Sequence, residues 1–174
     1  MGDDKVVFIS LIGVGRGRQE ESKGYAKAHY HFDEINHIID TSFFGSALYK
    51  VLTKQGHDVD KWLIFGTDKS SWSELLYLLD EKEHDDMIEL YAKVYDEENN
   101  GLSEELLNLW EKALRGFMPG IRLIIVDPLD YEIYIDHMVR EIPDGPRRIV
   151  LDITHGLRHM PVIMAFALMT LKHF

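Results

Sequence analysis

The chain has 174 residues, and its 19 Lys and Arg residues stand against 30 Asp and Glu residues, which gives a formal net charge of −11. Its content of 45% hydrophobic and 11% aromatic residues excludes a disordered chain, and the absence of Cys excludes disulfides, thiol nucleophiles and thiolate zinc sites. No apolar run approaches the roughly 20 residues that cross a bilayer, and residues 1–4 do not begin a signal peptide, so we expect one cytoplasmic domain over residues 1–174 with no membrane partner.

The first 65 residues predict three strands and one helix. In chain order these are a buried central strand over residues 6–12, a more exposed strand over 29–35, a helix over 41–54 and a strand over 62–65. Thr41 or Ser42 is the expected N-cap of the helix, because either side chain can accept a hydrogen bond from a free backbone N–H group.

The middle of the chain predicts three helices. The segment Ser71-Trp-Ser-Glu74 fits a capping box, in which Ser71 is the N-cap and Glu74 reaches back, at the start of a helix over residues 72–79. The helical period continues over residues 87–95, and Ser103 is expected to begin a further helix.

The negative charge lies in this middle region. Between Glu74 and Glu111 the chain has 13 acidic residues and two basic ones, Lys82 and Lys93, so the local charge is −11. The other residues carry 17 acidic and 17 basic side chains. We expect a solvated, acidic helical region here, and the net charge therefore does not exclude an anionic ligand elsewhere.

The last third of the chain predicts two strands that alternate with two helices. They are a strand over residues 121–126, a helix over 133–142, a strand over 148–153 and an apolar helix over 160–171. Strands that alternate with helices indicate an α/β fold with an open, mostly parallel sheet. Because the apolar last helix lacks a terminating signal, we expect further chain to follow residue 174.

The loop after the first predicted strand has the composition of an anion site. It reads Gly13-Val14-Gly15-Arg16-Gly17-Arg18 and lies where open parallel sheets bind ligands, at the carboxyl end of a strand. Glycines let backbone N–H groups approach an anion, and arginines donate forked hydrogen bonds to phosphate. Arg18 replaces the third glycine of a dinucleotide fingerprint, and no P-loop lysine follows. A flexible turn without a ligand is the alternative.

A second loop of interest follows the third predicted strand. It reads Gly66-Thr67-Asp68-Lys69-Ser70-Ser71-Trp72 and opens a helix. Hydroxyl and N–H groups at a helix N-terminus can bind an anion or a ribose. The candidate contacts are Thr67, Ser70, Ser71 and Trp72. In the alternative interpretation, Ser71 is only an N-cap and Trp72 packs against the sheet.

The loop after the last predicted strand is dense in reactive side chains. It reads Leu151-Asp152-Ile153-Thr154-His155-Gly156-Leu157-Arg158-His159-Met160-Pro161. A carboxylate, a hydroxyl, an imidazole and a guanidinium within seven residues favour a functional loop. Asp152 is expected to accept backbone N–H bonds and so cap the turn, in preference to contacting a ligand. Pro161 is expected to lie in the first turn of the following helix.

Three of these segments resemble motifs of one family. Asp152-Ile-Thr-His-Gly156 resembles the Asp-x-Thr-His-Gly motif of CRISPR-associated proteins that carry CARF domains. Gly66-Thr-Asp-Lys-Ser-Ser-Trp72 is similar to the Gly-Thr-x-x-Ser-x-Trp stretch of that family, and Thr41-Ser-Phe-Phe-Gly-Ser-Ala-Leu48 to its Thr-x-x-Phe helix start. The first motif is the most specific, and the resemblance spans residues 6–170.

The resemblance implies a Rossmann-like sensor domain of type III CRISPR defence that forms a two-fold homodimer. The implied ligand is cyclic oligoadenylate, bound across the dimer interface, with cyclic tetra-adenylate favoured and cyclic hexa-adenylate next. Ligand binding would control a covalent or associated effector, and neither a metal nor a further cofactor is expected. The expected ligand contacts are Gly13, Val14, Gly15, Arg16, Gly17, Arg18, Thr67, Ser70, Ser71, Trp72, Thr154, His155, Gly156, Leu157 and Arg158.

The charges of the three loops suit such a ligand. The basic side chains there are Arg16, Arg18, Lys69 and Arg158, and the acidic ones are Asp68 and Asp152. The expected pocket is therefore locally basic, whereas the acidic region at its flank discourages long nucleic acid from binding.

Two other activities are alternatives. The domain could also act as a metal-independent ring nuclease that holds a ribose 2′-hydroxyl in line with the adjacent phosphate, with His155 assisting proton transfer and Arg158 neutralising charge. A metal-dependent hydrolase could use His155 and His159, or His29 and His31. A third ligand is not evident for either pair, although Asp152 is near His155 in sequence.

Overall fold

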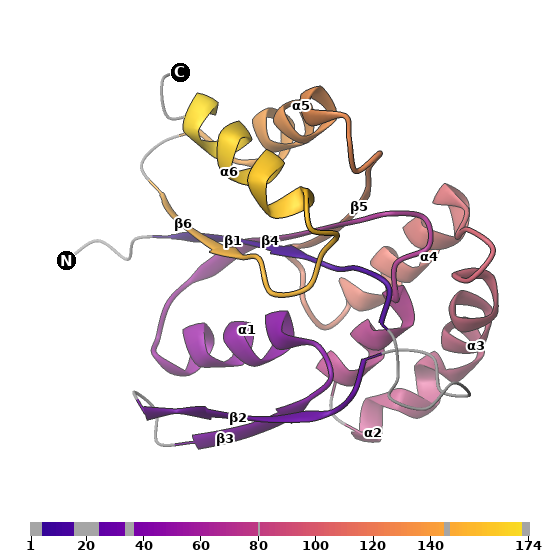
Figure 1. Cartoon of the computed structure of the whole chain (residues 1–174). Helices are drawn as coiled ribbons and strands as arrows, with labels where there is room; N and C mark the ends of the chain where they lie inside the picture. The colour runs from indigo at the N-terminus through magenta and orange to yellow at the C-terminus, as the bar shows by residue number, and fades with distance from the viewer. Residues whose placement is uncertain (1–4, 16–24, 34–36, 80, 145–146, 172–174) are drawn as a thin grey trace.

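A computed structural model describes residues 5–15, 25–33, 37–79, 81–144 and 147–171. Four strands form a parallel sheet in the order β5–β4–β1–β6, and two more form a separate hairpin (Figure 1). The strands are β1 (Val6–Leu11), β2 (Ala28–Phe32), β3 (His37–Thr41), β4 (Val59–Gly66), β5 (Ile121–Ile125) and β6 (Arg148–Asp152). The α-helices are α1 (Phe44–Lys54), α2 (Glu81–His84), α3 (Ile88–Glu97), α4 (Glu104–Leu114), α5 (Tyr131–Glu141) and α6 (Met160–Leu171), and the 3-10 helices are η2 (Trp72–Leu78) and η3 (Asp85–Met87).

β1 is an inner strand of the sheet. It pairs with β4 on one side and with β6 on the other, and all of its residues are buried. A strand covered on both faces needs an apolar side chain at nearly every position. The exception is Ser10, whose Oγ atom accepts a hydrogen bond from Trp62 Nε1 at 2.8 Å. The predicted buried central strand is confirmed.

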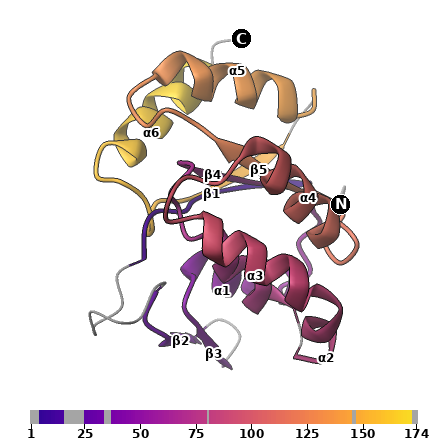
Figure 2. The ribbon, with the colours of Figure 1, turned by 90° about the vertical axis from the view of Figure 1, so that its right-hand side faces the viewer.

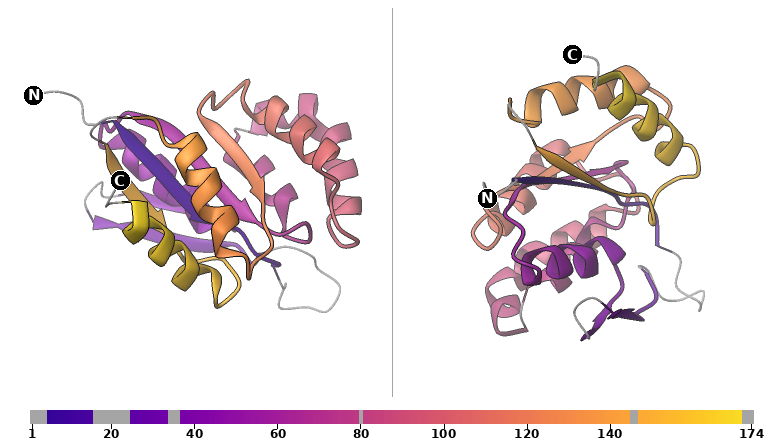
Figure 3. Two further views of the ribbon diagram at one scale, coloured as in Figure 1. Left: turned by 90° about the horizontal axis from the view of Figure 1, so that it is seen from above. Right: turned by 90° about the vertical axis from the view of Figure 1, so that its left-hand side faces the viewer.

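Helices cover both faces of the sheet, because successive side chains of β1 point to opposite sides. On one face, Phe8 and Trp62 belong to a core that also includes residues of η2, α3 and α4 (Figure 2). On the other face, Val7, Ile9 and Leu11 pack with α5 and α6, which lie next to each other above the sheet (Figure 3). The predicted fold, an open, parallel Rossmann-like sheet between layers of helices, is confirmed.

One predicted strand does not belong to the main sheet. β2 pairs antiparallel with β3, and Figure 1 shows this hairpin beyond α1, away from the four-stranded sheet. The hairpin packs on α1 through a small core of Ile39, Ala47 and Val51. The sequence analysis missed β3, because a five-residue strand gives too short a pattern to separate it from the start of a helix.

Two predicted helix caps are wrong, because other partners take the side chains. Neither Thr41 nor Ser42 caps α1: Thr41 ends β3 and bonds to Ser46 Oγ at 2.6 Å, and the Ser42 hydroxyl donates to Glu74. Ser71 makes no side-chain cap bond, and the 3-10 helix η2 stands where an α-helix was expected. Tertiary contacts therefore override the capping box.

The acidic region contributes to the core as well as to the surface. Ser103 caps α4 as predicted, since its hydroxyl accepts a hydrogen bond from Leu106 N at 3.3 Å. Three carboxylates of the region are buried, however: Glu74, Glu98 and Glu111. The expectation of a wholly solvated acidic region is wrong for these three. Among the described residues, no helix has both the length and the apolar character needed to cross a membrane.

Candidate functional site

The first and third loops meet at the edge of the sheet where β1 and β6 have their carboxyl ends. A cavity of about 420 Å³ opens at this edge. Its lining residues are Gly13, Val14, Tyr25, Thr154, His155, Gly156 and Leu157. Parallel strands place the loops that follow them side by side, so two segments separated by about 140 residues form one cavity.

The third loop approaches the end of β1 closely because position 156 is a glycine. A Cβ atom on Gly13 would lie 3.4 Å from the Gly156 Cα atom, and a Cβ atom on Gly156 would lie 3.0 Å from the Leu11 Cβ atom. The second distance is shorter than ordinary van der Waals contact. A side chain at position 156 would therefore push the third loop away from β1.

The second loop supports the first loop. Ser71 accepts a hydrogen bond from Gly15 N through its hydroxyl (2.9 Å), and its own N–H group donates to Gly13 O (2.9 Å). Ser70 Oγ donates to Ile12 O at 2.8 Å. These bonds hold the residues that follow β1 against the start of η2.

Three predicted contacts of the second loop do not line the cavity. Ser70 and Trp72 are fully buried, and Ser71 is 4% exposed. Trp72 packs in the core, and its Nε1 atom donates to Thr67 O at 2.8 Å. Their burial places all three outside the cavity wall, and for Trp72 it agrees with the alternative of packing against the sheet. Thr67 is half-buried and also lies outside the set of lining residues.

His155 forms part of the cavity wall and contacts two aromatic rings. Its imidazole lies 4.4 Å from the Tyr25 ring and 5.6 Å from the Phe43 ring, between centroids. Burial lowers the pKa of His155 below its ordinary 6.5, and the charge of Asp152 opposes this only in part. The imidazole is therefore neutral at pH 7. Its Nε2 atom is buried and has no hydrogen-bond partner among the described residues.

Asp152 holds the third loop at the end of β6. Its Oδ1 atom accepts a hydrogen bond from Thr154 N at 2.9 Å, the geometry that a local cap requires. Burial raises the pKa of Asp152, and the hydrogen bonds from Thr154 and the charge of His155 oppose that shift. The other carboxylate oxygen, Oδ2, is buried without a partner within the described residues.

The remaining predicted residues fall into three groups: exposed residues of the third loop, a residue of α6, and residues outside the described part of the chain. Thr154, Leu157 and Arg158 are exposed, and Arg158 does not line the cavity. Pro161 lies in the first turn of α6, as expected. Arg16, Gly17 and Arg18 lie outside the described residues.

Tyr25 is a cavity residue that the sequence analysis missed. It lines the cavity together with the two loops, and its ring lies against His155. A single aromatic residue that follows the glycine-rich loop gives no periodic signal and belongs to no motif. Only the spatial meeting of residues 13, 25 and 155 identifies it.

Comparison with known proteins identifies the family. A family model described as CRISPR system endoribonuclease Csx1, CARF domain, matches residues 7–174. The chain belongs to the Csx1 CARF-domain family. A relative from Methanocaldococcus jannaschii, described as CRISPR-associated protein MJ1674, is 31% identical over 193 aligned positions. The alignment covers 97% of this chain and 29% of the relative, so the chain spans less than a third of that protein.

The family match confirms the resemblance that the loop motifs indicated. This Csx1 CARF domain is a sensor domain associated with CRISPR systems. Its cavity at the carboxyl edge of the sheet lies within the matched residues. The cavity is therefore the candidate sensing site.

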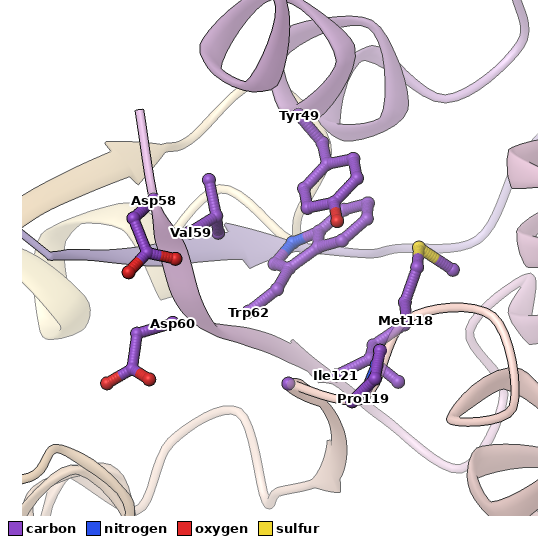
Figure 4. Close-up of a pocket in the computed structure, with 9 residues that line it drawn as sticks. Tyr49, Asp58, Val59, Asp60, Trp62, Met118, Pro119 and Ile121 are labelled. Atoms are coloured by element: carbon purple, nitrogen blue, oxygen red, sulfur yellow. The ribbon is translucent and has the colours of Figure 1, made fainter. Parts of the chain in front are cut away.

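The opposite edge of the CARF domain contains another cavity, of about 270 Å³, at the amino ends of β4 and β5. Figure 4 shows Tyr49 beside Trp62, with Asp58 and Asp60 toward one end. The two rings are stacked at 4.8 Å between centroids, and Asp60 is paired with Arg147 at 3.0 Å. This cavity lies away from the three loops and contains none of the predicted contacts.

The histidine pairs of the CARF domain do not gather into a metal site. In the part of the chain that the structure describes, no three His, Asp or Glu side chains are placed to hold a metal ion. His29 is paired with Asp40 at 2.5 Å and His31 with Asp33 at 3.2 Å, on an exposed face of the hairpin. Nothing in this arrangement supports the metal-dependent hydrolase.

Proposed function

We propose that this CARF domain binds cyclic oligoadenylate at the cavity between the first and third loops, with cyclic tetra-adenylate favoured over cyclic hexa-adenylate. The observation that carries the proposal is the convergence of Gly13, Thr154 and His155 on one cavity of a Csx1 CARF domain. A ligand made of phosphates, riboses and bases needs the groups that meet here: backbone N–H groups, a hydroxyl and an imidazole.

The geometry suggests how each group contributes. The neutral imidazole of His155 offers an unpaired Nε2 atom to a ribose hydroxyl or a phosphate oxygen. The exposed Thr154 hydroxyl and the Arg158 guanidinium can reach a ligand held above the cavity. We assign Arg16 and Arg18, which follow Gly15 in the chain, to the phosphates by their chemistry alone.

We further propose that two copies of the domain form a two-fold dimer through α6. Val162, Phe166 and Met169 recur on one face of this helix, and each is more than half exposed. α6 begins at the end of the third loop, and its buried residues share a core with Leu151 of β6, an edge strand of the sheet. A dimer that buries this face would bring the two third loops near one axis, where a ring with repeated phosphates has matching symmetry.

The dimer would transmit ligand binding to an effector. The relative is more than three times as long as the aligned part, and the family description joins the CARF domain to an endoribonuclease. We therefore propose an effector region as the covalent or associated partner, in the cytoplasm. Exposed acidic residues on η3, α3 and α4 disfavour long nucleic acid as a partner of this domain.

Titration calorimetry with synthetic rings tests the binding proposal. Cyclic tetra-adenylate is expected to bind the wild-type domain, and His155→Ala is expected to lower its affinity about tenfold or more, because the Nε2 contact is lost. His57→Ala, in the segment before β4 at the opposite edge, is the matched control and should bind like the wild type. An absence of heat with both the tetra- and the hexa-adenylate ring would contradict the proposal.

A ring nuclease is the second candidate, and the neutral His155 favours it. A general base must be unprotonated at working pH, and burial keeps this imidazole so. Arg158 would neutralise the charge that develops on the phosphate. Chromatography of cyclic tetra-adenylate after long incubation with excess domain is expected to show linear products that His155→Ala does not form. Intact ligand would exclude this activity while leaving the binding proposal in place.

A further inference from the structure

Tyr25 connects the two loops of the cavity. Its hydroxyl accepts a hydrogen bond from Gly13 N at 2.7 Å and donates one to Gly13 O at 2.8 Å. Its ring lies against His155, with 4.4 Å between centroids and 44° between planes. One side chain thus contacts the backbone of the first loop and the imidazole of the third.

The hydroxyl of Tyr25 is matched to a specific pair of backbone groups. Gly13 O also accepts a hydrogen bond from Ser71 N, so it keeps a partner if the Tyr25 hydroxyl is removed. For Gly13 N, by contrast, the hydroxyl is the partner that the described residues provide. Gly13 itself is buried, and a buried N–H group without a partner is unfavourable. The hydroxyl therefore determines whether the residue that opens the first loop stays where it is.

Tyr25 is itself held in place by contacts with Glu74 and Phe43. Its backbone N–H group donates to the Glu74 carboxylate at 3.3 Å, and the Ser42 hydroxyl donates to the same carboxylate. Its ring also stacks on Phe43 at 6.3 Å between centroids. Phe43 is part of the hydrophobic core and Glu74 is a buried residue of η2, so Tyr25 links the two loops to well-packed parts of the domain.

We propose that Tyr25 is a positioning residue of the sensing site, which holds the Gly13 backbone with its hydroxyl and the His155 imidazole with its ring. The expected effect of Tyr25 on ligand affinity rests on the proposed function. Its expected effect on the positions of the two loops does not. The hydroxyl and the ring act on different loops, so substitutions can separate them.

Tyr25→Phe tests the hydroxyl. Hydrogen exchange of the Gly13 amide is expected to become at least about tenfold faster, because the amide loses its acceptor. Affinity for cyclic tetra-adenylate is expected to fall about tenfold. His155, whose ring contact remains, should titrate by NMR as in the wild type.

Tyr25→Leu tests the ring. Removing the aromatic cover exposes the imidazole to water, so the pKa of His155 is expected to rise toward its ordinary 6.5. Asp152 is the charged group that acts on this imidazole among the described residues, and it is unchanged in both variants. If Tyr25 had only a structural role, both variants would lower the thermal midpoint. They would then not differ in the way expected here, where Tyr25→Phe changes the exchange of the Gly13 amide but not the pKa of His155, and Tyr25→Leu also changes that pKa.

Tyr49→Phe is the matched control. Tyr49 is also a half-buried tyrosine stacked on an aromatic ring, but it lines the cavity at the opposite edge of the sheet (Figure 4). Removing the Tyr49 hydroxyl should leave three quantities unchanged: the hydrogen exchange of the Gly13 amide, the pKa of His155 and the affinity for cyclic tetra-adenylate. Wild-type exchange at Gly13 in Tyr25→Phe, or a wild-type His155 pKa in Tyr25→Leu, would overturn the inference. If the wild type binds no ring, the proposed function fails, and exchange and titration still decide the role of Tyr25.

Discussion

Two glycines at the ends of neighbouring strands have different surroundings. A Cβ atom on Gly66, the last residue of β4, would lie 2.7 Å from Ile12 Cγ2 and 2.7 Å from Trp72 Cζ2. On Gly13, just beyond β1, the closest atom would be 3.4 Å away, which is ordinary contact. Gly66 is thus required by packing, because the side chains of Ile12 and Trp72 lie against it. Gly13 is required by neither packing nor conformation.

Gly66→Ala is expected to lower the free energy of unfolding by about 2 kcal/mol, because the added methyl group overlaps buried side chains that cannot move freely. Gly13→Ala is the control and should cost less than about 0.5 kcal/mol. Urea unfolding followed by tryptophan fluorescence measures both values. Similar losses for the two variants would show that the core above Gly66 can adjust.

At the scale of elements, an ion-pair network joins edge strand β5 to helices on both faces of the sheet. Arg122 of β5 donates to Glu141 of α5 through two nitrogen atoms, at 2.9 and 2.6 Å, and to Glu111 of α4 at 2.9 Å. The hydrogen bonds from Arg122 lower the pKa of Glu141, and burial opposes them in part. The network therefore stabilises the folded state through the ionised form of Glu141.

The pH dependence of stability tests this network. Because the pKa of Glu141 is lower in the folded than in the unfolded chain, its contribution is present above about pH 4.5 and is lost as the pH falls through the folded pKa. Glu141→Gln is expected to lower the free energy of unfolding by about 1 kcal/mol at pH 7, with a difference that shrinks below pH 4.5. Asp136→Asn, exposed on the same helix, is the control and should change the free energy of unfolding at pH 7 by less than about 0.5 kcal/mol. A loss that is constant from pH 7 to pH 3 would exclude the ionic contribution.

For the whole molecule, the apolar face of α6 is the feature that points beyond a single chain. The helix is apolar around its circumference, with Met160, Met164 and Ala167 buried and Val162 and Phe166 exposed. A helix of this composition is normally covered on all sides. The proposed two-fold dimer would cover the exposed side.

Phe166→Glu is expected to convert a dimer into monomers, because a charge at the centre of this face would be buried without a partner. Leu109→Glu, at a half-exposed leucine of α4, is the control and should keep the wild-type mass. Sedimentation equilibrium measures both. A wild-type domain that is monomeric at high concentration, or a Phe166→Glu variant that stays dimeric, would contradict this interface.

The sequence by itself determined the alternation of strands and helices, the buried β1, the Ser103 cap and the loops that carry the family motifs. These signals depend on side chains within a few residues of one another, so hydrophobic period and turn chemistry are sufficient. Only the tertiary structure decided that Glu74 accepts hydrogen bonds from Tyr25 and Ser42 instead of capping with Ser71. It also decided that Trp72 is buried in the core and that β2 pairs outside the main sheet. Tyr25 meets its partners Gly13 and Glu74 across 12 and 49 residues of chain, and contacts at such separations exist only after the sheet has brought its strand ends together.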